Sequence, residues 1–129
     1  MCQRRHCFLD GIGDDPVGCD YLVHYPGPAE DLDAWLRHYL SHHAPIMMTF
    51  PNVRSVDVFT RIDWRDALPW QRVAYMQRNR IAFDSPTQLL AALASPVRDR
   101  MRQDHDCFPP FAGGSRHYPM LVSRMAGPR

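Results

Sequence analysis

A histidine pair stands just before a proline in the segment HHAPIMMTFPNV, residues 42–53. An imidazole can accept or donate a proton near neutral pH, because its unperturbed pKa is ~6.5. His43 continues the helical spacing of the apolar residues before it, whereas His42 falls at the border of that stripe. We therefore expect His43 to point inward and to serve as a general acid or base if it borders a cavity. The alternative is a buried histidine that only fills the core and binds helix carbonyls.

Two further residues could join His43 in acid–base chemistry. His24 lies on an expected strand, and it would sit either near His43 or at a subunit interface, depending on which sheet face covers it. Asp57 lies on a second expected strand, where it could orient an imidazole or simply pair with Arg72 or Arg78.

Four residues are candidates for the wall of a substrate pocket, namely Tyr39, Met47, Phe50 and Tyr75. A phenol can meet a substrate carbonyl while its ring packs, and methionine with phenylalanine makes an adaptable apolar wall. The same side chains would serve equally well as ordinary core.

Composition limits the class of protein. The chain has 129 residues, 45% hydrophobic and 22% charged, which predicts one folded domain. Its formal net charge of +1 argues against a nucleic-acid partner, because no strong field attracts phosphate. No apolar run is long enough for a membrane span or a signal peptide, so we expect no membrane partner and a cytoplasmic location.

The sequence also predicts that no metal and no nucleotide is bound. The cysteines, mostly N-terminal, lack the paired spacing of zinc sites, and helical phase sends His38 and His42 away from His43. The glycine-rich segment PPFAGG has no following helix whose amides could hold phosphate. We expect no cofactor.

The elements that position these residues follow from periodicity and breakers. Residues 1–18 show no periodicity, so we expect them to form a poorly ordered tail. We expect residues 19–129 to form the domain. Alternating runs predict four strands, and 3.6-residue periodicity predicts two helices, the second interrupted at a Ser-Pro pair. The expected strands are 19–25, 52–62, 72–83 and 116–125, and the expected helices are 30–44 and 85–105.

Local sequence rules set the details of the helices. Pro45 should end the first helix near Ala44. Ser85 and Gln88 should form a capping box at the start of the second. The expected inward faces are Leu32, Trp35, Leu36, Tyr39 and Leu40 in the first helix, and Leu89, Leu90, Leu93 and Val97 in the second. Pro119 favours an edge position for the last strand, because proline donates no ladder hydrogen bond.

The order strand, helix, strand, strand, helix, strand predicts an α+β, ferredoxin-like fold, with a four-stranded antiparallel sheet and both helices on one face. The opposite face would carry either Tyr21, Val23 and Tyr25 or Leu22 and His24. Neither set suits exposure, so a second subunit covering that face is expected.

The blocks HHAPIMMTFPNV, VAYMQRNRIAFDSPTQLLAALASP and FAGGSRHYPMLVSRM resemble the EthD-like branch of the dimeric α+β barrel superfamily. The likeness covers residues 19–125, with His43, Pro45 and Pro51 as its most specific positions. Asn52 stands where many relatives have glycine.

The resemblance implies a homodimer whose sheets face each other, with a pocket in each subunit for a small apolar or aromatic molecule. Members are associated with ether degradation alongside an oxygenase, and relatives include lactone isomerases, polyketide cyclases and cofactor-free monooxygenases. Three functions remain open: a small-molecule enzyme that uses His43, a non-catalytic ligand-binding accessory of an oxygenase, and haem binding through His43.

Overall fold

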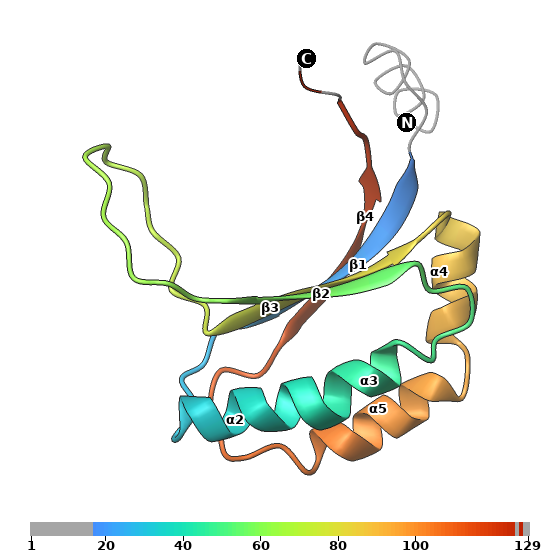
Figure 1. Ribbon diagram of the computed structural model, residues 1–129, viewed down its shortest axis with the longest axis horizontal. Helices are drawn as coiled ribbons and strands as arrows, with labels where there is room; N and C mark the ends of the chain where they lie inside the picture. The colour runs from blue at the N-terminus through green and yellow to red at the C-terminus, as the bar shows by residue number, and fades with distance from the viewer. Residues whose placement is uncertain (1–16, 126, 128–129) are drawn as a thin grey trace.

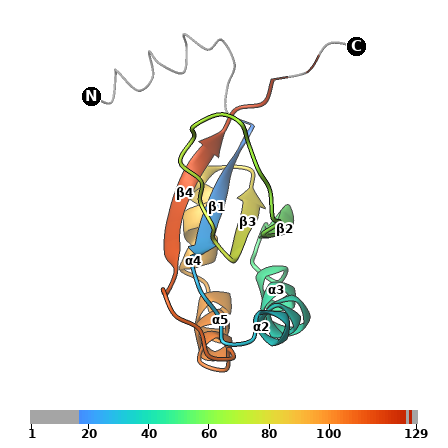
Figure 2. The ribbon, with the colours of Figure 1, turned by 90° about the vertical axis from the view of Figure 1, so that its left-hand side faces the viewer.

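The computed structural model describes residues 17–125 and 127. Its helices lie on one face of a four-stranded antiparallel sheet (Figure 1), in the strand order β2-β3-β1-β4 (Figure 2). The elements are β1 (Gly18–Tyr25), α2 (Leu32–His38), η1 (Tyr39–His43), α3 (Ala44–Met47), β2 (Ser55–Thr60), β3 (Gln77–Phe83), α4 (Pro86–Leu93), α5 (Val97–His105) and β4 (Arg116–Val122). The ferredoxin-like arrangement expected from the sequence is confirmed. Most of the expected tail lies outside the described residues, and β1 already begins at Gly18.

Strand alternation decides which side chains of β1 face the helices. Tyr21, Val23 and Tyr25 belong to the buried core cluster, so Leu22 and His24 lie on the opposite face. We call that opposite side the outer face of the sheet. β4 is an edge strand, which confirms the position expected for Pro119.

The first helix runs further than Pro45 suggested. α2, the π-helical segment η1 and α3 follow each other without a break from Leu32 to Met47. Pro45 lies in the first turn of α3, directly after η1, where a missing N–H and a fixed φ are tolerated. In η1 the hydrogen bonds span five residues, as between the amide of Ala44 and the carbonyl of Tyr39. The expected end near Ala44 was therefore one turn too early.

The π-helical segment also changes which side chains point inward. His43 is only 3% exposed, as expected, but Leu40 is 51% exposed and its predicted inward position was wrong. Because a π-helix has more residues per turn than an α-helix, the inward stripe continues from Tyr39 to His43 and Met47.

β2 and β3 are shorter than the alternating sequence predicted. Thr60 and Gln77 form their last pair, and residues 61–75 are exposed. Figure 1 shows this segment as an arm that extends away from the sheet. A strand needs a partner to satisfy its backbone, and neither limb of the arm continues the ladder. Asn52, just before β2, has a φ of 62°, a left-handed conformation that asparagine and glycine tolerate best.

The second helical region breaks between α4 and α5 at Ser95 and Pro96, as expected. Ser85 caps α4 by accepting a hydrogen bond from the amide of Gln88 at 3.2 Å. The Gln88 side chain does not reciprocate, since its Oε1 is buried without a partner among the described residues, so only half of the capping box forms. Leu89 is buried as expected, but Leu90 is 61% exposed and its predicted inward position was wrong.

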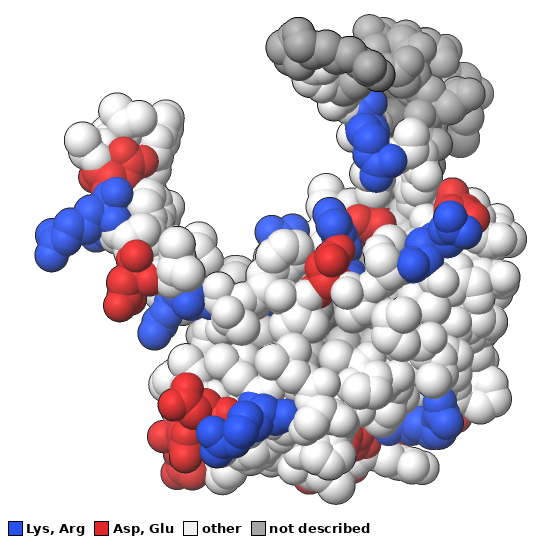
Figure 3. Space-filling model, viewed as in Figure 1, with Lys and Arg blue, Asp and Glu red and all other residues white. Residues whose placement is uncertain are grey.

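Charged side chains are interspersed by sign on the face shown in Figure 3, with no large area of a single sign. The face shown in Figure 3 therefore has no extended track of positive charge for a phosphate backbone. None of the described helices has the length and apolar character required to cross a bilayer.

Candidate functional site

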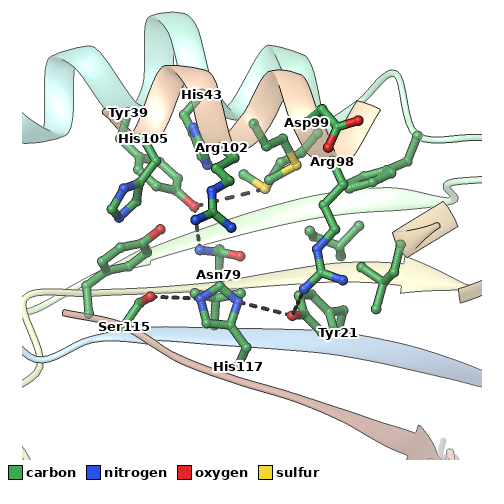
Figure 4. A pocket seen from close by; sticks show the side chains of 17 residues that line it. Tyr21, Tyr39, His43, Asn79, Arg98, Asp99, Arg102, His105, Ser115 and His117 are labelled. Carbon is green, nitrogen blue, oxygen red and sulfur yellow. Dashed lines mark hydrogen bonds between the residues drawn. The ribbon is translucent and has the colours of Figure 1, made fainter. Parts of the chain in front are cut away.

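The space between the sheet and the helices contains a cavity of about 490 Å³. This volume lies within the range of small-molecule sites. The strands β1, β3 and β4 form its floor, and η1, α3 and α5 form its roof (Figure 4). Tyr39, His43, Met47 and Phe50 line this cavity, so four of the predicted site residues come together there.

His43 is held from behind by Asp104 of α5. Its Nδ1 lies 2.9 Å from Oδ2 of Asp104, and because a carboxylate only accepts, Nδ1–H donates. Nε2 has no hydrogen bond within the described chain and is the nitrogen left for a ligand. Burial lowers the pKa of His43 from 6.5, while the hydrogen bond and charge of Asp104 oppose this shift. The imidazole is therefore neutral at pH 7, with Nε2 ready to accept a proton.

Asp104 also binds His38, which the sequence placed away from His43. Nε2 of His38 lies 3.2 Å from Oδ1 of Asp104. Residues five apart lie above one another in a π-helix, which brings His38 and His43 to the same carboxylate. His42 is exposed and stacks on His38 instead.

A buried amide and phenol lie deep in the cavity. Nδ2 of Asn79 donates to the Tyr39 hydroxyl at 2.5 Å, and burial raises the pKa of Tyr39 well above 10.0. Oδ1 of Asn79 is buried without a partner among the described residues. A buried acceptor without a donor is costly, so a donor on a ligand would relieve it.

A second polar group lies at the β1–β4 side of the cavity. The Tyr21 hydroxyl lies 3.1 Å from Nδ1 of His117, and Nε2 of His117 lies 2.7 Å from Oγ of Ser115. Burial, followed by the positive charge of Arg98, lowers the pKa of His117 from 6.5. A neutral ring here accepts at one nitrogen and donates at the other.

Three predicted site residues lie outside the cavity, on the outer face or near it. His24 binds the Tyr118 hydroxyl at 2.7 Å, and its ring centroid is 5.0 Å from that of Tyr75. Tyr75 lies before the start of β3 and is 37% exposed, and its contact with His24 places it by the outer face. Asp57 accepts from Nη2 of Arg80 at 2.6 Å, opposite it in the sheet, and not from Arg72 or Arg78.

Sequence reasoning missed the residues that complete the site. Asp104 gave no sequence signal, because 61 positions separate it from His43. Asn79 could have been found, since the strand QRNRIAF places it on the same side as the apolar Ile81 and Phe83. A polar residue in that series is a buried one that needs a partner.

No family model matches the chain, and no curated protein matches it. Several solved structures, however, are similar to it. An EthD family protein from Bacillus halodurans superposes with a TM-score of 0.59 at 17% identity, covering 84% of this chain and 99% of that one. A monooxygenase of Streptomyces coelicolor in complex with nanaomycin D gives 0.62 at 13% identity, covering 92% and 98%. SnoaB, a cofactor-independent oxygenase from Streptomyces nogalater, gives 0.60 at 10% identity, covering 88% and 99%.

The chain therefore has the fold shared by an EthD family protein and by small-molecule oxygenases. The resemblance seen in the sequence is confirmed at the level of the fold. Fold does not choose a reaction, so the chemistry must be argued from the site. Within residues 17–125 and 127, no group of three or more His, Cys, Asp or Glu side chains is arranged to hold a metal ion.

Proposed function

We propose that this protein is a cofactor-free enzyme that acts on an apolar or aromatic, lactone or polyketide-like molecule, with His43 as its general base. One observation carries the proposal: a neutral imidazole, oriented by Asp104 at 2.9 Å, lines a cavity of about 490 Å³. A carboxylate on one ring nitrogen fixes the tautomer and stabilises the imidazolium that forms when the other nitrogen takes a proton.

The proposed step is removal of a proton from a carbon next to a substrate carbonyl. The C–H bond breaks, the proton goes to Nε2 of His43, and the electron pair forms an enolate. This step begins lactone isomerisation, ring closure of a polyketide chain and reaction of a carbanion with molecular oxygen. Isomerisation, ring closure and oxygenation thus need the same general base. Such a base contributes about 10²- to 10⁴-fold to the reaction rate.

The structural neighbours support the proposed substrate class. One is a cofactor-independent oxygenase, and another is a monooxygenase in complex with nanaomycin D. A cavity floored by tyrosine and apolar side chains suits a molecule of similar character.

The test is hydrogen–deuterium exchange of 2-tetralone, a bicyclic ketone, followed by proton NMR in D₂O. The protein should accelerate exchange at the carbon next to the carbonyl, and His43→Gln should abolish most of that acceleration. His42→Gln is the matched control, because His42 is exposed and outside the cavity. Acceleration that persists in His43→Gln would refute the role of His43, and acceleration lost on adding a chelator would refute cofactor independence.

A non-catalytic accessory function predicts a different result in the same experiment. The ketone would bind, as seen by shifts of cavity resonances, without faster exchange. That outcome would replace the enzymatic proposal by a ligand carrier for an oxygenase pathway.

We infer, further, that the chain works as a homodimer through the outer face of the sheet. This face carries Phe59, Tyr118 and Met120, of which Phe59 and Met120 are 46% and 53% exposed. It also carries the paired charges of Asp57 and Arg80. Apolar side chains beside paired charges on a broad sheet suit a self-complementary interface.

A further inference from the structure

Two arginines enter the cavity from α5. Arg98 and Arg102 lie one turn apart and both line the cavity, and Figure 4 shows their side chains reaching toward the sheet. Neither forms an ion pair with a carboxylate in the described part of the chain. The lining includes a single carboxylate, that of Asp99, against these two guanidinium groups. The cavity therefore has an excess of permanent positive charge on its α5 side.

Arg98 is oriented by the polar group at the β1–β4 side. Its Nη2 donates to the Tyr21 hydroxyl at 3.4 Å. An arginine only donates, so the Tyr21 oxygen accepts from Arg98, while the tautomer of His117 sets the direction of the bond between Tyr21 and Nδ1, 3.1 Å apart. The guanidinium has five N–H donors, and this contact uses one of them, which leaves donors for a ligand.

Apart from these arginines and the polar groups described above, the cavity has an apolar wall. Its lining includes the aliphatic and thioether side chains of Val23, Ile81, Leu93, Met47 and Met101 and the ring of Phe50. A ligand that complements both the two arginines and the apolar wall has a flat apolar body and one negatively charged oxygen group. Guanidinium groups recognise such oxygens by charge-assisted, often paired, hydrogen bonds.

We propose that the cavity binds aromatic anions: a ring system lies against the apolar wall, and an ionised oxygen, either of a carboxylate or of an acidic enol, lies between Arg98 and Arg102. As a substrate class this rests on the proposed function, but the binding does not require His43. The same guanidinium groups would also stabilise an enolate oxygen formed from the substrate, because they are already in place when charge develops.

Two matched ligand pairs test the proposal by isothermal titration calorimetry at pH 7.5. The first is 2-naphthoate with its neutral amide, 2-naphthamide. The second is 2-hydroxy-1,4-naphthoquinone, whose enol is ionised at this pH, with its neutral 2-methoxy ether. At least one anion should bind roughly tenfold or more tightly than its neutral partner, as charge-assisted hydrogen bonds exceed neutral ones. The pair that shows the preference identifies the oxygen group.

Arg98→Met and Arg102→Met should each reduce the anion preference, and the double variant should abolish it. Arg100→Met is the matched control on the same helix, because Arg100 is exposed, outside the cavity lining, and binds Thr49. Each variant is checked for an unchanged thermal unfolding midpoint. Equal binding of anions and neutral partners, no binding of any probe, or an equal loss in Arg100→Met would overturn the proposal.

Titrations of His43→Gln separate this inference from the proposed function. Anion preference retained in that variant supports the arginine site even if the wild-type protein never accelerates exchange of 2-tetralone. Conversely, His43-dependent exchange without anion preference supports the enzyme and refutes the arginine site.

Discussion

Nδ1 of His43 and Oδ2 of Asp104 lie 2.9 Å apart and join two helices that are distant in the sequence. His43 lines the cavity, whereas Asp104 lies behind it and does not. Asp104 is therefore a positioning residue, which acts on a substrate only through the imidazole that it orients.

Asp104→Asn should lower the rate of 2-tetralone exchange by roughly 10- to 100-fold, because an amide no longer favours the tautomer with Nε2 free. It should also lower the pKa of His43 further, since the hydrogen bond and charge of Asp104 now raise it. NMR titration of the His43 ring measures this change in pKa. If Asp104 only stabilised the fold, the pKa of His43 would stay unchanged. Asp106→Asn, at an exposed position on the same helix end, is the control.

Stability should fall as the pH falls below about 6.5, the unperturbed pKa of histidine. Burial lowers the pKa of His43 in the folded protein, so the unfolded chain binds the proton more readily. The contribution is fully present above the unfolded pKa and is lost as the pH falls toward the lower folded pKa. Urea unfolding between pH 7.5 and 5.5 measures it. His43→Gln should flatten this dependence and His42→Gln should not; equal slopes in the two variants would contradict the assignment.

Leu89 and Leu90 should differ sharply although they are neighbours. Leu89 is 1% exposed, and Leu89→Ala should lower the free energy of unfolding by about 2–5 kcal/mol through lost burial and a cavity. Leu90 is 61% exposed, and Leu90→Ala should change it by no more than about 0.5 kcal/mol. Chemical denaturation of both variants decides whether α4 has the orientation described.

Variants of Met120 and Met48 test the proposed dimer. The two residues are exposed to the same degree, 53% and 52%, but Met120 belongs to β4 and Met48 follows α3. Met120→Glu places a charge on the outer face of β4 and should raise the dimer dissociation constant at least tenfold. Met48→Glu, at the end of α3, should leave it unchanged. Sedimentation velocity measures both, and a monomeric wild-type protein at micromolar concentration would refute the dimer.

Periodicity was enough to predict the element order and the ferredoxin-like topology. Strand alternation and helical phase depend on local backbone geometry, which each segment carries in its own residues. The inward position of His43 was predicted on the same ground. The ends of elements were predicted less well, as at Thr60, because a strand stops where its partner stops and not where its own pattern does.

The sequence by itself determined that an imidazole, that of His43, points into the core from the first helical region. Only the tertiary structure decided what that imidazole can do. The π-helical segment brought His38 and His43 to one carboxylate, and the packing of α5 supplied Asp104, Arg98 and Arg102. The reason is physical: the protonation preference of a side chain depends on the charges and burial around it, and these come from segments that no local pattern relates.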